Sequence, residues 1–152
     1  MLKRREMLAR SATVAGLMAS AGLWPALARA DWNQPAFEAK SVADAIKAIG
    51  GSPPTESKDV TITGPDIAEN GAVVPIGAAT ALPGVKRMLI LIEKNPSVLA
   101  AAFDVSDAVE ANFSTRVKMA QSSNVYAVAM MADGKVLFAQ KEIKVTLGGC
   151  GG

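Results

Sequence analysis

The only cysteine of this 152-residue chain, Cys150, stands between two pairs of glycines at the C-terminus, Gly148-Gly149 and Gly151-Gly152. A thiol is a nucleophile, and no other side chain here stands in a setting of comparable reactivity. Glycine has no Cβ and loses the most conformational freedom on ordering, so residues 148–152 are predicted to form a flexible arm that presents the thiol. Five extended residues span at most about 16–18 Å, enough to carry a sulfur atom into a cleft of another protein. The alternative is a frayed terminus with an incidental thiol.

The rest of the composition provides no residue that is expected to activate this thiol. The sequence has no histidine, which excludes histidine metal sites, C-x-x-C-H haem attachment and Ser-His or Cys-His catalytic pairs. A single cysteine cannot form an intramolecular disulfide or hold a metal cluster. A free thiol has a pKa of about 8.5 and is mostly protonated near neutral pH, and the terminal carboxylate two residues away disfavours the thiolate further. Activation must therefore come from an active site into which Cys150 is inserted, so we expect a carrier with no cofactor and no catalytic residues of its own.

The first thirty residues have the pattern of an export signal. A short basic segment with Arg4-Arg5 is followed by an apolar run from about 12 to 27 and then by Ala28-Arg29-Ala30. These are the three parts of a secretory signal peptide, and the paired arginines indicate the twin-arginine (Tat) route. The apolar run is short and is broken by two glycines and Pro25, so a retained membrane span is not expected. We predict cleavage after Ala30 and a periplasmic protein with no membrane segment.

Cleavage would change the charge balance of the chain. Five of the 16 basic residues and one of the 14 acidic residues lie in 1–30, so the remaining 122 residues carry 11 basic and 13 acidic groups, a formal net charge of −2. This single-domain length with near-neutral charge gives no electrostatic case for nucleic-acid binding. Because the twin-arginine route carries folded cargo and no cofactor is indicated, we expect a protein partner that is exported together with the chain.

A short helix is predicted near the start of the mature chain. Ser41-Val-Ala-Asp44 matches a capping box, in which the Ser41 hydroxyl accepts from the Asp44 N–H and the Asp44 carboxylate accepts from the Ser41 N–H. Apolar residues then follow at helical spacing until Gly50-Gly51 supplies a stop. The helix is expected over about 42–49.

From residue 58 onward the pattern alternates, as in β-strands. Turn signals separate seven or so strands, among them the hairpin signal Asp133-Gly134. The run 86–92 begins with Lys86-Arg87 and is then continuously apolar from Met88 to Ile92, as in a strand covered on both faces. Pro75 argues for an edge strand or a bulge. Residues 31–147 are therefore predicted to form an all-β, antiparallel sandwich of the immunoglobulin or fibronectin-like type, whose last strand, 142–147, leads directly into the arm.

Three segments together resemble a known family. The C-terminal Val-Thr-Leu-Gly-Gly-Cys-Gly-Gly, the segment 58–71 (KDVTITGPDIAENG) and the segment 113–119 (FSTRVKM) are similar to SoxY, the sulfur-carrier subunit of the bacterial Sox thiosulfate-oxidation system. The twin-arginine leader fits the same family. The resemblance covers residues 31–152.

The resemblance implies that thiosulfate becomes attached to Cys150 through an oxidative sulfur–sulfur bond, and that Gly148, Gly149, Gly151 and Gly152 form the swinging arm. It also implies a heterodimer with SoxZ, a smaller β-sandwich without its own signal. The enzymes that act on the arm would be a haem enzyme that loads the cysteine, a hydrolase that releases sulfate and, in some organisms, a molybdenum–haem dehydrogenase.

Two other functions share parts of this pattern. An exported adhesion or assembly module could use its cysteine for an intermolecular disulfide. Ubiquitin-like sulfur carriers also end in Gly-Gly, but their terminal thiocarboxylate is made with ATP, which the periplasm lacks. An adduct on Cys150, an obligate disulfide dimer or a modified Gly152 carboxylate would distinguish the three.

Overall fold

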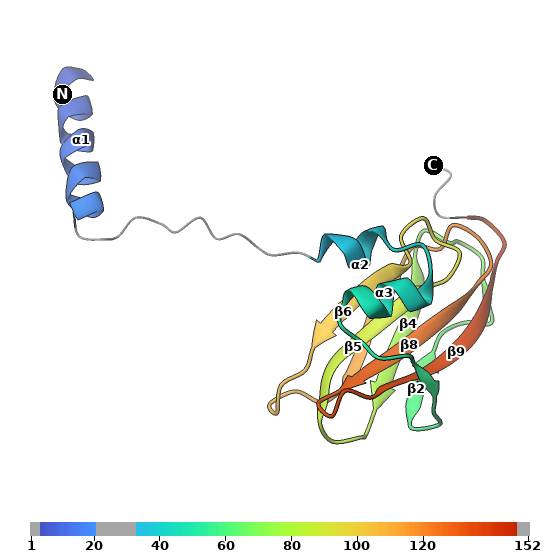
Figure 1. Cartoon of the computed structure of the whole chain (residues 1–152). Helices are drawn as coiled ribbons and strands as arrows, with labels where there is room; N and C mark the ends of the chain where they lie inside the picture. The colour runs from blue at the N-terminus through green and yellow to red at the C-terminus, as the bar shows by residue number, and fades with distance from the viewer. Residues whose placement is uncertain (1–3, 21–32, 149–152) are drawn as a thin grey trace. The chain divides into compact units, whose positions relative to one another are not determined.

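The computed structural model describes residues 4–20 and 33–148 of the chain. The chain separates into two compact units, Met1–Trp32 and Asn33–Gly152. The described part of the first unit is one helix, α1 (Arg4–Ser20), drawn in blue in Figure 1. No helix within the described ranges is both long enough and apolar enough to cross a membrane.

The second unit begins with two short helices, α2 (Gln34–Glu38) and α3 (Val42–Ala48). Helix α3 is the predicted helix, and its cap is built largely as expected. The Ser41 hydroxyl accepts from the Asp44 N–H at 3.1 Å, but the Asp44 carboxylate accepts from the Ser41 hydroxyl at 2.6 Å and not from its backbone N–H. At the other end Gly50 adopts a left-handed φ of +86°, and the N–H groups of Gly50 and Gly51 return to the last turn of α3, the arrangement that glycine permits at little cost.

Helix α2 has no counterpart in the sequence-based prediction. It is a single turn with Asn33 as its N-cap, since the Asn33 side chain accepts from the Ala36 N–H at 3.1 Å and donates to the Ala48 carbonyl at 2.9 Å. Asn33 therefore caps α2 and ties it to the end of α3. Ala36, Ala45 and Ile46 are buried beneath the pair.

Nine strands complete the second unit: β1 (Thr55–Glu56), β2 (Val60–Thr63), β3 (Ile67–Ala68), β4 (Val74–Thr80), β5 (Val85–Ile92), β6 (Leu99–Asp104), β7 (Asn112–Val117), β8 (Ser123–Met131) and β9 (Val136–Val145). The larger sheet has the order β1-β9-β8-β5-β6, with β3 also paired to β9, and the smaller sheet has the order β2-β4-β7. All the long ladders are antiparallel, as predicted. The two-residue strands β1 and β3 instead run parallel to β9.

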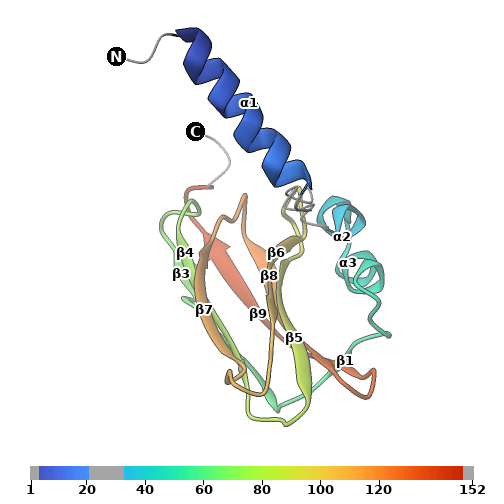
Figure 2. The same ribbon diagram turned by 90° about the vertical axis from the view of Figure 1, so that its left-hand side faces the viewer.

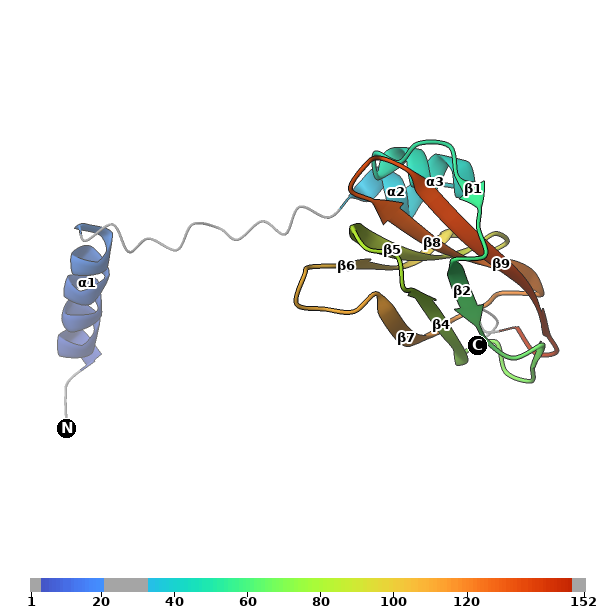
Figure 3. The ribbon, with the colours of Figure 1, turned by 90° about the horizontal axis from the view of Figure 1, so that it is seen from below.

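The two sheets and the helix pair form three layers, which Figures 2 and 3 show from two directions. One apolar cluster fills the space between the sheets, and a second lies between the larger sheet and helices α2 and α3. Strand β5 contributes side chains to both clusters. Met88, Ile90 and Ile92 face the smaller sheet, whereas Leu89 and Leu91 face the helices, which is why the run 88–92 is apolar throughout.

The position of Pro75 differs from the prediction. Strand β4, which contains it, is the central strand of the smaller sheet and not an edge strand. However, β2 pairs with β4 only from Thr80 to Gly77, so at Pro75 the strand has β7 alone as its neighbour. The missing N–H is therefore tolerated because the second ladder has already ended.

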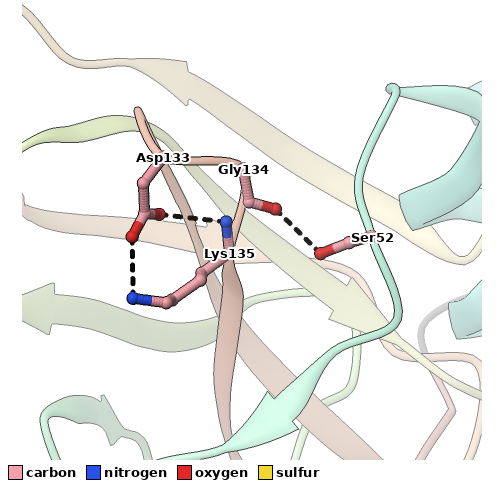
Figure 4. A network of polar contacts seen from close by, with 4 residues as sticks. All are labelled: Ser52, Asp133, Gly134 and Lys135. Carbon is pink, nitrogen blue, oxygen red and sulfur yellow. Dashed lines mark hydrogen bonds and ion pairs between the residues drawn. The ribbon is translucent and has the colours of Figure 1, made fainter.

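The predicted hairpin at Asp133-Gly134 is present between β8 and β9, and Figure 4 shows its polar contacts. The Asp133 carboxylate accepts from the Lys135 backbone N–H at 3.0 Å and pairs with the Lys135 ammonium at 2.8 Å. Gly134 has a φ of +88°, and its carbonyl accepts from the Ser52 hydroxyl at 2.8 Å. The linker after α3 is thus held to the hairpin that starts β9.

These features confirm the predicted fold class. The second unit is an all-β sandwich with a short N-terminal helical segment, and its last strand, β9, ends three residues before Gly148.

Candidate functional site

Of the residues predicted to form the arm, the structure describes Gly148. Gly149, Cys150, Gly151 and Gly152 lie outside the described residues. The site that the structure does describe is the root of the arm, the segment 144–148 and the backbone that holds it.

One side of this root is held by the segment 66–71. The Thr146 N–H donates to the Ala68 carbonyl at 3.0 Å, and its hydroxyl donates to the Glu69 carbonyl at 2.9 Å. One residue further on, the Leu147 carbonyl accepts from the Gly71 N–H at 2.7 Å. The chain is therefore fixed on this side for two residues beyond the end of β9.

The other side of the root is held by the segment 118–122. The Val145 N–H donates to the Ser122 hydroxyl at 2.9 Å. This segment is fixed in turn by Asn95, whose side chain donates to the Lys118 carbonyl at 2.7 Å and accepts from the Ala120 N–H at 3.0 Å. We refer to the segments 66–71 and 118–122 together as the root clamp.

Gly71 joins the two halves of the root clamp. Its N–H donates to the Leu147 carbonyl, and its own carbonyl accepts from the Met119 N–H at 2.7 Å. Because both bonds are between backbone groups, the clamp does not depend on which side chains the three residues carry.

Gly148 is the last residue within the clamp, and its glycine is required by space. A Cβ built at this position would overlap the backbone carbonyl oxygen of Ala120. This oxygen belongs to a peptide segment that Asn95 holds, so it cannot move aside as the end of a flexible side chain could. At Gly148 the role of glycine is therefore close packing against Ala120.

An ion pair joins Lys141 of β9 to Asp66, the first residue of the segment 66–71. The Lys141 ammonium lies 2.8 Å from the Asp66 carboxylate and also donates to the Gly64 carbonyl at 2.7 Å. The hydrogen bond and the charge of Lys141 hold the pKa of Asp66 below its usual value. This contact fixes the start of the segment 66–71 on β9.

Within the described ranges, nothing forms a catalytic or metal-binding cluster. No group of three or more His, Cys, Asp or Glu side chains there could hold a metal ion. A hollow of about 830 Å³ lies at the opposite end of the sandwich, lined in part by Thr80, Leu82, Val85 and Val109, far along the strands from the root. What the described contacts do is fix the segment 145–147 at one end of the sandwich.

Comparison with known proteins then gives the family. A family model described as "Sulfur oxidation protein SoxY" matches residues 46–150, more than half of the chain and as far as Cys150 itself. The chain belongs to the SoxY family. No curated protein sequence matches it.

A solved structure supports the same assignment. The sulfur carrier protein SoxY from Chlorobium limicola f thiosulfatophilum is 39% identical to this SoxY-family chain, with a TM-score of 0.64, and the match covers 70% of this chain and 97% of that one. A superoxide reductase (neelaredoxin) from Ignicoccus hospitalis, 18% identical with a TM-score of 0.51, covers 57% of this chain and 79% of its own. At that identity the second likeness concerns the fold alone.

Family membership confirms the identification made from the sequence, and with it the prediction of a carrier component of sulfur oxidation and not an enzyme. The root clamp has no signature in the sequence. Gly71, Asn95 and Ala120 act through backbone groups or a single amide, and no pattern in the sequence marks them.

Proposed function

We propose that this SoxY-family chain is a periplasmic carrier that holds thiosulfate-derived sulfur intermediates on Cys150 and presents them to successive Sox enzymes. The observation that carries the proposal is the placement of the only cysteine, which is the residue at which the family match ends. It stands two residues beyond a root that the domain fixes from both sides.

The loading step follows from the chemistry of a thiol. The Cys150 thiolate and the terminal sulfur of thiosulfate form a sulfur–sulfur bond, giving Cys–S–S–SO₃⁻. The two electrons released would pass one at a time through the haem iron of the loading enzyme to an external electron acceptor. The hydrolase then adds water across the bond between sulfur and the sulfonate group. Sulfate and two protons leave, and a persulfide remains on Cys150 for a molybdenum–haem dehydrogenase where one is present. The carrier supplies the thiol and the tether, and the enzymes supply the activation.

Export by the twin-arginine route is part of the same proposal. The leader supports it through Arg4-Arg5 and the alanine-rich site at Ala28–Ala30. A heterodimer with SoxZ, exported as a folded complex, would explain the use of this route by a chain without an indicated cofactor. Tethering also raises the effective concentration of the intermediate at each enzyme.

The test is the intact mass of protein purified from thiosulfate-grown cells, before and after reductant. We expect the mass of residues 31–152 with additions of sulfur or thiosulfate that reductant removes. Cys150→Ser should fold normally, carry no such addition and abolish thiosulfate-dependent oxygen uptake in a reconstituted system. Retained uptake would refute the proposal, and so would a modified Gly152 carboxylate or an obligate disulfide dimer without adducts.

A further inference from the structure

The reach of the proposed carrier thiol is set by where the root clamp ends. The last described backbone contact of the chain is at Leu147, and Gly148 packs against Ala120. From the Gly148 Cα, two extended residues reach the Cys150 Cα within about 7 Å, and the cysteine side chain adds roughly 3 Å. In any conformation of residues 149–152, the sulfur of Cys150 therefore lies within about 10 Å of the Gly148 Cα.

This limit is shorter than the length of the five-residue arm 148–152 suggests. An enzyme that reacts with the sulfur must bring its reactive centre to within about 10 Å of the end of the sandwich. The walls of its active site extend around that centre. Those walls must therefore lie against the surface from which the chain leaves.

That surface carries exposed apolar side chains. Leu147, Ile67 and Val73 are 66%, 57% and 54% exposed, and they are three of the five large apolar side chains exposed in the described part of the second unit. Ile67 and Leu147 lie on the two backbone segments that are joined at the root, 66–71 and 144–148. Ile67 pairs with Lys144, the Leu147 carbonyl accepts from Gly71, and Val73 follows two residues later.

We propose that Ile67, Val73 and Leu147, named here the root surface, are the docking surface for the rim of the active-site channel in the enzymes that process Cys150. This proposal rests on the proposed carrier function. The partner that binds this surface is the entrance of an enzyme's active-site channel. Its rim carries apolar side chains, and its thiol-reactive centre lies within about 10 Å of that rim. This partner is chosen because the chain beyond Gly148 is short. An enzyme that reaches the Cys150 sulfur must therefore approach the end of the sandwich from which the chain leaves.

The test compares exposed residues at the two ends of the sandwich. Leu147→Ser removes an apolar side chain at the root, and Val109→Ser is the matched control, because Val109 is also exposed (47%) but lies in the loop between β6 and β7 at the opposite end. The triple variant Ile67→Ser/Val73→Ser/Leu147→Ser gives the full effect. Circular dichroism and thermal unfolding check that each variant is folded.

The first readout is loading of thiosulfate by the purified haem loading enzyme of the same organism, with ferricyanide as the electron acceptor. We expect the triple variant to raise the KM for the carrier about tenfold with little change in kcat, as for loss of docking contacts. Val109→Ser should match the wild type, and the reaction of Cys150 with a small disulfide reagent should be the same in all variants. An unchanged KM in the triple variant would overturn the docking surface.

The second readout separates docking from the carrier chemistry. Binding of Cys150→Ser protein to the same enzyme is measured by calorimetry, with and without the three serine substitutions. Binding that the serine substitutions weaken supports the docking surface even if the wild type is never loaded, in which case the carrier function alone fails. Binding that they leave unchanged, or the absence of any binding, overturns the docking surface.

A change in reach provides an independent check. Two glycines inserted after Gly148 extend the reach by about 7 Å, so the enzyme no longer needs to contact the root surface so closely. The KM penalty of Leu147→Ser should then become smaller. A penalty that stays the same in the longer arm would contradict the argument from reach.

Discussion

Replacement of Gly148 by alanine tests the root clamp directly. The added Cβ would overlap the carbonyl oxygen of Ala120. The segment that carries this oxygen is held by Asn95, which accepts from the Ala120 N–H at 3.0 Å, so the chain at residue 148 must move instead. The hydrogen bond that this movement strains is the nearest one, from the Gly71 N–H to the Leu147 carbonyl at 2.7 Å.

The size of the effect follows from two opposing contributions. An overpacked contact with a strained hydrogen bond lowers the free energy of unfolding by about 1–3 kcal/mol, with a middle value of about 2 kcal/mol. Alanine also restricts the unfolded chain, which stabilises by about 0.4–1 kcal/mol. We expect a net loss of about 1 kcal/mol, or a fall in Tm of roughly 3–6 °C for a domain of this size.

The measurement is urea denaturation of Gly148→Ala beside the same substitution at Gly149, one residue past the clamp. Amide exchange at the Gly71 N–H reports the strained bond. Exchange at the Val105 N–H, which donates to the Lys86 carbonyl toward the opposite end of the sandwich, serves as an internal reference. We expect lower stability and faster Gly71 exchange in Gly148→Ala alone. Equal stability of the two variants, with Gly71 equally protected, would refute the clamp.

Two further predictions concern the contacts that support the clamp. Asn95→Ala removes both side-chain bonds to the segment 118–122 and leaves the Ala120 N–H without its acceptor. The free energy of unfolding, measured by urea titration, should therefore fall by about 1–3 kcal/mol. Asn95→Asp keeps the acceptor and should lose less. The pKa of Asp66 is lowered in the folded protein by Lys141, so this pair contributes stability that is present above the usual carboxyl pKa of 3.8 and is lost as pH falls below it through the lowered value. Lys141→Met should therefore flatten the dependence of stability on pH in this acid range, and a parallel pH profile in the variant would contradict the assignment.

Much of the fold could be predicted because the relevant signals are local. The apolar run of β5 and the Asp133-Gly134 turn each specify their own structure within a few residues. The same holds for Ser41 and Gly50 at the two ends of α3, where one side chain and one left-handed glycine decide the boundaries.

The features that could not be predicted depend on distant partners or on very short elements. Strands β1 and β3 are two residues long and show no alternation that could reveal a parallel pairing with β9. Helix α2 is a single turn, too short for helical periodicity. The tolerance of Pro75 depends on where β2 ends, which is a property of the register between two strands.

The candidate site divides in the same way. Cys150 and its glycines are visible in the sequence because their composition is unusual. The root clamp holds the chain through backbone groups and the Ser122 hydroxyl, in contacts that span 23 and 77 residues of the sequence. A backbone hydrogen bond places no demand on side-chain identity, and a single serine forms no pattern. Gly148 was predicted as part of the arm for its freedom, whereas the structure gives it a further constraint, the approach to Ala120.

The pairing of β9 has a mechanical consequence for the carrier. This strand is bonded to β8 along its length on one side and to β1 and β3 on the other. A pull on the C-terminus acts along β9, parallel to its neighbours, so it loads these hydrogen bonds in shear and many must break together. If an enzyme grips the terminal residues, the force reaches a strand braced from both sides, and the domain can be drawn away from an active site without unravelling from its last strand.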